Sequence, residues 1–204
     1  MKKENFERML ENMLSTGGDF AEIFLEDKKT TIYNYVDSNL DGYSVNYSSG
    51  LGLRLAKENN VYYAATNDFS NKNINSIINS LKENINGKAI YDYVSLNRIK
   101  KYKNNHKTHY TNEDIKKLFN NLDKKIRIKD ERINQVSLNL QNVKQNVTIA
   151  RENGLYKKEE RERTRLYITI SLKDNDKACN IAYSYGKTIS LDLLDEINYD
   201  EVIN

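Results

Sequence analysis

The chain has 204 residues, of which 38% are hydrophobic and 30% are charged, and its formal net charge is +3. Its apolar residues recur in periodic runs, which excludes a fully disordered chain, and no apolar stretch reaches the roughly 20 residues of a membrane-spanning helix. The single cysteine, Cys179, excludes a disulfide framework, and residues 1–14 lack a signal-peptide core, so we expect a cytoplasmic protein.

Residues 1–87 are expected to form a first unit, in which two helices accompany an antiparallel meander. Apolar residues at helical spacing predict one helix that ends at Gly17-Gly18 and another over 71–86 that Gly87 caps. Alternating and β-branched stretches predict strands over 19–27, 30–36, 43–47, 50–55 and 61–65. The turn signals between strands are Leu40-Asp41-Gly42 and Glu58-Asn59-Asn60.

Residues 88–110 are expected to be a polar, basic linker, and residues 111–195 a second unit. Asn112 is a suitable N-cap for a helix to about Ile128, and alternation predicts strands over 133–141, 146–151, 155–163, 165–172 and 177–185. Asn153-Gly154 predicts a type I′ hairpin, and Asp174-Asn175-Asp176 predicts another turn. A helical pattern that opens near Leu191 stops at the chain end, so residues 196–204 indicate the start of a truncated helix. The predicted fold class is therefore α+β, with two small units that each combine a helix with an antiparallel β-meander.

The positive charge is concentrated in the middle of the chain. Residues 98–165 carry a net +10, whereas residues 1–97 and 166–204 carry −3 and −4. This pattern fits a polyanionic partner, and it equally fits attraction between parts of one chain. Acidic residues interleave with the basic ones at Glu159, Glu160 and Glu162, where cross-strand ion pairing is the simpler account. Nucleic-acid binding is therefore the weaker alternative.

The residue types that carry chemistry do not form a recognisable active site. His106 and His109 have the spacing H-x-x-H, but no nearby acid or cysteine completes a zinc set, so we interpret them as part of a solvated basic loop. Cys179 has no histidine neighbour and is predicted to be a small packed residue, not a nucleophile. Asp174 and Asp176 lie between lysines and are predicted to form a turn, not a metal loop. We expect no catalytic and no metal-binding residue in this chain.

Four short motifs, in a fixed order, nevertheless resemble a known family. They are Gly18-Asp19-Phe20-Ala21-Glu22, then Gly50-Leu51-Gly52-Leu53-Arg54, then Ala65-Thr66-Asn67-Asp68, and finally Glu152-Asn153-Gly154 before a charged strand. Their order and spacing are similar to the N-terminal and middle domains of the TldD/PmbA family of zinc metalloproteases, over about residues 1–195. The positions that match the family motifs are interpreted as structural, and they are Gly18, Glu22, Gly50, Gly52, Arg54, Thr66, Asn67 and Asp68.

The resemblance implies a role in peptide degradation or maturation. In the family, a His-Glu-x-x-x-His helix and a later cysteine of a C-terminal domain hold zinc, and nothing in this sequence matches that motif. We therefore expect a chain without zinc that is inactive alone and helps to build a dimer and the walls of its substrate chamber. The expected partners are a second copy or a family paralogue, and the expected substrates are unfolded or small peptides. The alternatives are a stand-alone assembly module that pairs with a zinc-bearing family member, or the nucleic-acid-binding module mentioned above.

Overall fold

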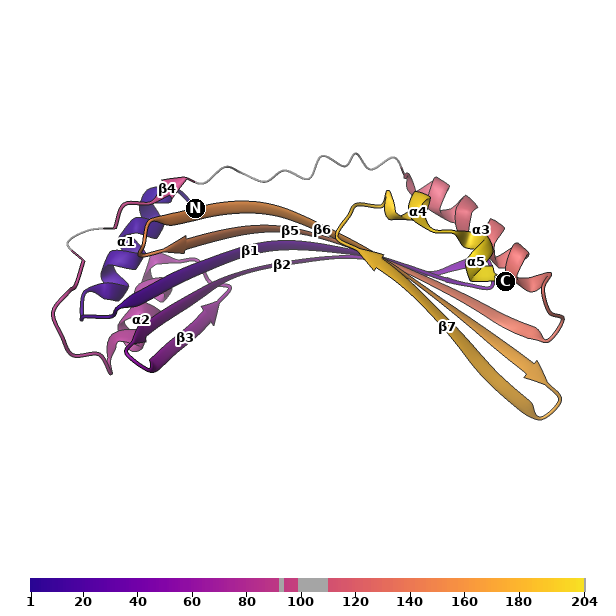
Figure 1. The fold of residues 1–204 in the computed structure, drawn as a ribbon, viewed down its shortest axis with the longest axis horizontal. Helices are drawn as coiled ribbons and strands as arrows, with labels where there is room; N and C mark the ends of the chain where they lie inside the picture. The colour runs from indigo at the N-terminus through magenta and orange to yellow at the C-terminus, as the bar shows by residue number, and fades with distance from the viewer. Residues whose placement is uncertain (92–93, 99–109, 204) are drawn as a thin grey trace. The chain divides into compact units, whose positions relative to one another are not determined.

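A computed structural model describes residues 1–91, 94–98 and 110–203, and it confirms the α+β class (Figure 1). None of the helices in these ranges is both long enough and apolar enough to span a membrane. The elements in chain order are α1 (Lys3–Leu14), β1 (Phe20–Val36), β2 (Asn39–Lys57), β3 (Asn60–Thr66), α2 (Asn71–Lys82), β4 (Asn97–Arg98), α3 (Asn112–Arg127), β5 (Ile133–Arg151), β6 (Leu155–Asp174), β7 (Lys177–Lys187), α4 (Leu193–Glu196) and α5 (Tyr199–Ile203).

The described strands form one sheet in the order β3-β2-β1-β5-β6-β4, and β7 also pairs with β6. The β2–β3 and β6–β7 pairs are antiparallel, and the short β4 runs parallel to β6. β1 and β5 run in opposite directions, because the Glu152 amide donates to the Ala21 carbonyl while the Asp37 amide donates to the Val136 carbonyl. The prediction of two separate meanders is therefore wrong.

Strand length accounts for this difference. The structure has β1, β2, β5 and β6 as continuous strands of 17, 19, 19 and 20 residues, where the sequence pattern predicted two shorter strands for each. Polar residues such as Asp27-Lys28-Lys29 interrupt the alternation without interrupting the hydrogen-bonded ladder. Continuity of a strand depends on its neighbours in the sheet, which a local pattern does not contain.

The chain divides into two compact units that are discontinuous in sequence. Unit 1 comprises Met1–Lys28, Ser48–Lys103 and Gln145–Glu160. Its core packs the apolar faces of α1 and α2 against one face of the strands, and it includes Phe6, Leu10, Met13, Leu14, Ile23, Leu51, Leu53, Leu55, Ile74 and Ile78. The i, i+3, i+4 spacing of the α1 residues places them all on one side of that helix, which is why this segment is helical and buried.

Unit 2 comprises Lys29–Tyr47, Asn104–Lys144 and Arg161–Asn204. Helix α3 begins with a capping box, in which Thr111 and Asp114 exchange side-chain and backbone hydrogen bonds. The ring of Tyr35 meets that of Phe119 edge-on, at 5.0 Å between centroids. The core of unit 2 includes Ile115, Phe119, Leu122, Ile126, Leu138, Leu140, Leu166, Ile168, Leu194 and Ile197.

Two turn predictions are wrong. The β1–β2 turn lies at Asp37 and Ser38, whose φ angles of 51° and 64° are those of a type I′ turn, and not at Leu40-Asp41-Gly42. At the β5–β6 turn only Gly154 has a positive φ, of 89°, so this turn cannot be type I′. The Gly154 amide donates to the Arg151 carbonyl instead, as in a type I turn followed by a glycine bulge. The turns at Glu58-Asn59 and Asn175-Asp176 are confirmed.

Helix ends also differ from the prediction. Helix α2 ends at Lys82 and not near Gly87, in a stretch where Asn84 and Asn86 favour helix weakly. The N-cap of α3 is Thr111, one residue before the predicted Asn112. The C-terminal pattern forms two short helices, α4 and α5, and not one.

Candidate functional site

Glu22 occupies the centre of a charged cluster on the sheet of unit 1. Its neighbours Ala21 and Ile23 are buried in the core, so strand alternation directs Glu22 to the opposite face. There its Oε2 lies 2.6 Å from Arg151 Nη2 of β5, and its Oε1 lies 3.6 Å from Arg54 Nη1 of β2. The Glu22 side chain is only 13% exposed, so the two guanidinium groups compensate a carboxylate that is largely removed from water.

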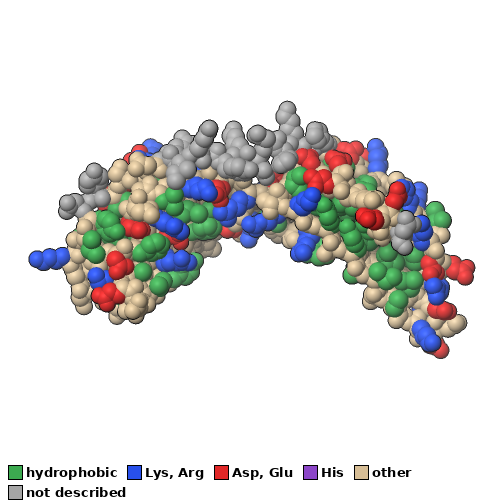
Figure 2. All heavy atoms as spheres, in the orientation of Figure 1, with side chains coloured by type: hydrophobic (Ala, Val, Ile, Leu, Met, Phe, Trp, Pro, Cys, Tyr) green, Lys and Arg blue, Asp and Glu red, His purple; other side chains and the backbone are tan. Residues whose placement is uncertain are grey.

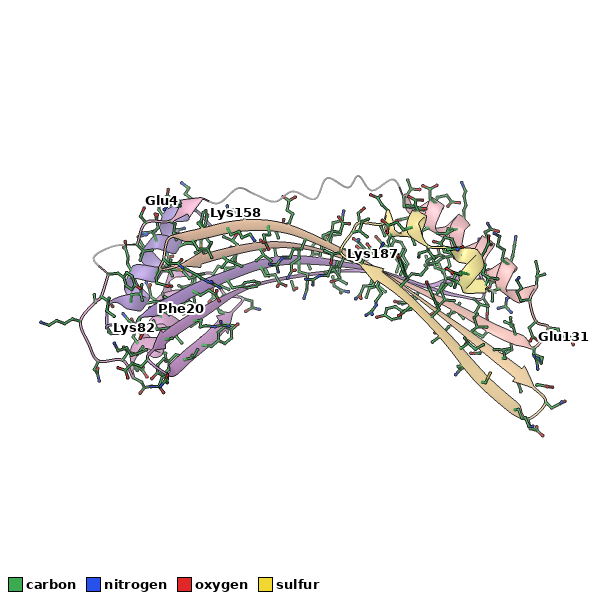
Figure 3. All side chains as sticks on the ribbon, in the orientation of Figure 1. Glu4, Phe20, Lys82, Glu131, Lys158 and Lys187 are labelled. Carbon is green, nitrogen blue, oxygen red and sulfur yellow. The ribbon has the colours of Figure 1, made fainter. Side chains whose placement is uncertain are left out.

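Aromatic rings flank this cluster on both sides. The Arg151 guanidinium lies 5.8 Å from the ring of Phe20, near the start of β1 (Figure 3). On β3, Tyr63 is directly opposite Arg54 in the antiparallel register. The Tyr63 hydroxyl lies 2.9 Å from where a Cβ on Gly52 would stand, so the absence of a side chain at Gly52 makes room for this ring. We call Phe20, Glu22, Arg54, Tyr63 and Arg151 together the charged stripe.

Glu152 is hydrogen-bonded to the backbone of Ala21, the residue of β1 that precedes Glu22. The Glu152 carboxylate accepts a hydrogen bond from the Ala21 amide at 3.0 Å, and the Glu152 amide donates to the Ala21 carbonyl at 3.2 Å. These two bonds fix the position of Glu22 relative to Arg151. The first family motif, which contains Ala21 and Glu22, and the last, which contains Glu152, are thus in contact.

The remaining predicted site residues lie elsewhere in unit 1. Thr66 and Asp68 build the turn from β3 into α2: Thr66 Oγ1 accepts from the Asp68 amide and from Asn73 Nδ2, at 3.0 and 2.9 Å. Gly18 precedes β1, where a Cβ would stand 2.7 Å from Leu55 Cδ1. Gly50 and Asn67 show no comparable constraint, since a Cβ at Gly50 would have ordinary room and Asn67 is exposed.

Sequence reasoning missed three members of the charged stripe, namely Phe20, Tyr63 and Arg151. Arg151 contacts Glu22 across 129 positions of sequence. The local signal in the sequence is that Arg151 directly precedes the Glu152-Asn153-Gly154 motif. This position does not predict that Arg151 pairs with Glu22.

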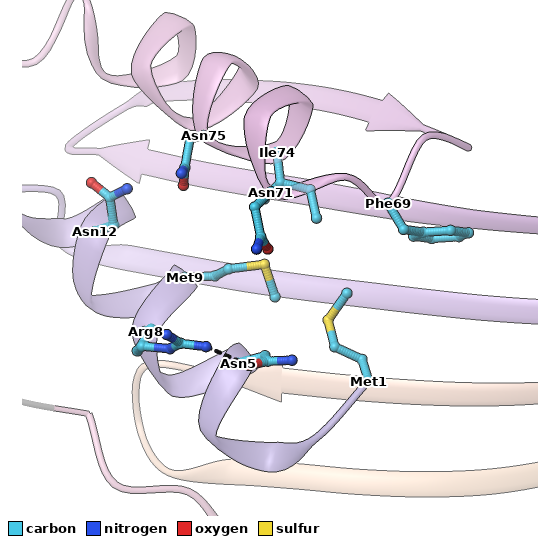
Figure 4. A pocket seen from close by; sticks show the side chains of 9 residues that line it. All are labelled: Met1, Asn5, Arg8, Met9, Asn12, Phe69, Asn71, Ile74 and Asn75. Atoms are coloured by element: carbon cyan, nitrogen blue, oxygen red, sulfur yellow. Dashed lines mark hydrogen bonds between the residues drawn. The ribbon is translucent and has the colours of Figure 1, made fainter.

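A second candidate is a groove of about 330 Å³ between α1 and α2 (Figure 4). Met9 and Ile74 contribute apolar atoms to it, and asparagine amides from both helices line it. One of these amides, Asn12 Oδ1, accepts a hydrogen bond from Lys82 Nζ at 2.7 Å. Partial burial lowers the pKa of Lys82, so this ammonium group depends on such acceptors.

Comparison with known families decides how the chain is classified. Residues 21–85 match the model of the PmbA/TldA metallopeptidase domain 1, and residues 105–203 match that of the PmbA/TldA metallopeptidase central domain. The chain belongs to the PmbA/TldD metallopeptidase family. A search of curated proteins finds none that matches it.

Solved structures share this PmbA/TldD fold at low sequence identity. A protein from Thermotoga maritima described as a modulator of a DNA gyrase is 13% identical, with a TM-score of 0.67 over 99% of this chain and 46% of its own. A protein from Bacteroides thetaiotaomicron described as a modulator of DNA gyrase is 16% identical, with a TM-score of 0.62 over 93% of this chain and 46% of its own. TldE from Thermococcus kodakarensis is 15% identical, with a TM-score of 0.63 over 98% of this chain and 45% of its own. The chain thus spans about half the length of these structures.

A metallopeptidase family implies a metal, and the described residues do not fit one. Within residues 1–91, 94–98 and 110–203, no group of three His, Cys, Asp or Glu side chains could hold a metal ion. His106 and His109 lie outside the described residues. Cys179 is exposed on β7, so the prediction that it is packed is wrong. Among the described strands β7 pairs with β6 only, and most of its side chains are exposed.

Several basic residues of the middle segment pair with acidic side chains. Arg127 pairs with Asp37 and Asp123, and Arg132 pairs with Asp130 at 2.6 Å. The predicted cross-strand pairing is confirmed for Glu162, which lies 3.5 Å from Lys144 of β5. Acidic side chains accordingly lie among the basic ones over both units (Figure 2). This interleaving disfavours a nucleic-acid surface.

Proposed function

We propose that this chain is the non-catalytic N-terminal and central portion of a TldD/PmbA-like metallopeptidase that degrades or matures peptides. The observation that carries the proposal is the match to domain 1 and then to the central domain of the family, in chain order. In this role the chain contributes to a dimer and to the walls of its substrate chamber. The zinc-binding residues of the family belong to a C-terminal domain, so the chain alone is inactive.

Strand β3 supports a role in contacting peptides or partner chains. Among the described strands it is the first in the sheet order and pairs with β2, so within that part of the chain its other side offers unpaired backbone groups. Val61 and Tyr63 are each 63% exposed on this strand. An extended peptide or a strand of a partner can add to such an edge through main-chain hydrogen bonds.

We further propose the cytoplasm as the location, to which an exposed and unpaired cysteine is suited. The organisation into residues 1–87, the linker 88–110, residues 111–195 and the segment 196–204 belongs to the same proposal. We also propose that the eight motif positions have a structural role, and two of them, Glu22 and Arg54, lie in the charged stripe.

The exposed β3 edge also favours a related function, that of an assembly module. In this case the partner is a zinc-bearing family member, and the chain serves to complete the dimer. In the first proposal the partner is a second copy or a paralogue, and the zinc belongs to the C-terminal domain of the family. In the assembly-module alternative the zinc is carried by the partner.

Reconstitution tests the proposal. The purified chain is mixed with a full-length family member that carries the His-Glu-x-x-x-His motif, and hydrolysis of fluorogenic peptides and the mass of the complex are measured. We expect no hydrolysis by the chain alone, formation of a mixed or self-paired dimer, and a weaker dimer in Tyr63→Lys. The matched control is Tyr47→Lys, another exposed tyrosine, which lies in unit 2. Hydrolysis by the pure chain in proportion to bound zinc would contradict the proposal. So would a chain that stays monomeric both alone and in the mixture with the family member.

A further inference from the structure

A shallow hollow of about 320 Å³ lies on the sheet of unit 2, beside the last residues of β7. Gln141 and Val143 of β5, Arg163 and Arg165 of β6, and Gly186 and Thr188 contribute to its walls. Lys187, which marks the end of β7 in Figure 3, also lines it. The hollow is therefore bounded by three neighbouring strands of one sheet.

The structure holds Arg165 in a defined position. Its guanidinium carbon lies 5.0 Å from the ring of Tyr167, two residues along β6 and on the same face. In the β6–β7 register Arg165 is opposite Gly186, and its Cγ and Nε lie 3.2 and 3.4 Å from where a Cβ on Gly186 would stand. The stem of Arg165 thus crosses the backbone of β7 at a position without a side chain. An arginine held in this way loses little side-chain entropy when it binds an anion.

Two positive charges of the hollow remain uncompensated. Arg163 and Arg165 are exposed, and neither pairs with a carboxylate within the described residues. Other arginines of the sheet and of α3 do pair with carboxylates, as Arg127 and Arg151 show. Lys187 is itself neutralised by Glu196, at 2.5 Å. The hollow therefore presents two free guanidinium groups, two residues apart on one strand.

This arrangement selects a small anion. A guanidinium group pairs with a carboxylate through two parallel hydrogen bonds, and the Gln141 amide and Thr188 hydroxyl supply further polar groups at the walls. A polynucleotide draws its affinity from a run of phosphate contacts, which two free cations do not provide. We propose that the hollow binds one carboxylate group of a peptide through Arg163 and Arg165.

That the carboxylate belongs to a peptide rests on the proposed function. Two sources have this chemistry, the carboxyl terminus of the peptide and an acidic side chain within it. Either would orient a peptide against the strands of unit 2.

Binding of three synthetic peptides to the complete chain tests this inference by fluorescence anisotropy at low salt. The peptides share one neutral sequence and end in a free carboxylate, in an amide, or in an amide with one internal Glu. We expect a carboxylate to strengthen binding roughly tenfold, because it forms charge-assisted hydrogen bonds. Whichever carboxylate peptide binds more tightly identifies the source.

Arg163→Gln and Arg165→Gln should each remove most of this roughly tenfold gain, since each deletes one guanidinium group. The matched control is Lys173→Gln, which removes one exposed positive charge from the same strand outside the hollow. Thermal melting of each variant verifies that it is folded.

Equal binding of the amidated neutral peptide, or unchanged affinity in both arginine variants, would overturn the inference. Displacement of the peptide by a single-stranded DNA oligonucleotide with a steep salt dependence would also overturn it, in favour of a nucleic-acid surface. The assay requires neither zinc nor a catalytic partner. Failure of the reconstitution experiment is thus distinguishable from failure of this one.

Discussion

At the scale of single residues, Glu22 shows how a motif position acts through partners that lie far away in sequence. Its carboxylate contacts Arg54 on one side and Arg151 on the other. Because the two arginine side chains are 49% and 39% exposed, solvent screens part of each interaction. The contribution of the cluster to stability therefore comes mainly from compensating the largely buried carboxylate of Glu22.

Glu22→Gln should lower the free energy of unfolding by about 1 kcal/mol, since two arginines lose their negatively charged partner while the neutral amide keeps the shape of the side chain. Urea unfolding followed by circular dichroism measures the change. Glu131→Gln is the matched control, because Glu131 is exposed and has no partner within the described part of the chain (Figure 3). A loss no larger than that of the control would show that the cluster contributes nothing to stability.

At the scale of elements, the connection from α3 to β5 depends on Asp130. Hydrogen bonds from the Arg132 side chain, and then from its backbone amide, lower the pKa of Asp130 from 3.8 to about 2. The folded state thus favours the ionised form. Its contribution to stability is fully present above pH 3.8 and is lost as the pH falls towards 2.

Asp130→Asn should make the thermal midpoint less dependent on pH between 3.8 and 2, because the variant has no carboxylate to protonate there. Melting curves across this range measure the effect, and Asp41→Asn in an exposed part of β2 is the control. If the variant and the wild type lose stability in parallel on acidification, Asp130 is not responsible.

Elements also show what sequence can and cannot predict. Phe6, Leu10 and Leu14 predicted α1 correctly, because helical periodicity is a property of the segment itself. The extent of β1 was not predictable, because the strand continues through Lys28 and Lys29, which separate the two predicted strands and do not have the pattern of a strand. In the same way Glu22 and Arg54 were found as motif positions, whereas Arg151 and Tyr63 are neighbours that only the pairing of strands reveals.

At the scale of the molecule, the two units share four strands. β1, β2, β5 and β6 each contain residues of both units. Each unit has its own core with a phenylalanine that is 0% exposed, Phe6 in unit 1 and Phe119 in unit 2. Breaking either core should therefore affect strands that belong to both.

Phe6→Ala and Phe119→Ala should each lower the free energy of unfolding by roughly 3–5 kcal/mol and should shift one common transition. Calorimetry measures the number of transitions, and Phe69→Ala at a site 38% exposed is the matched control with a much smaller effect. Two separate transitions, of which each core variant moves only one, would show that the units unfold independently.

The discontinuity of unit 1 has a consequence for how the protein is made in the cell. Its sheet joins Ala21 to Glu152, 131 residues further along the chain. At the usual pace of translation the ribosome needs on the order of ten seconds to synthesise that interval. During this time the nascent N-terminal segment has its helices and β2 but lacks β5, the other neighbour of β1, and its apolar surface is open to chaperones. Completion of the first unit must therefore wait until most of the chain has left the ribosome.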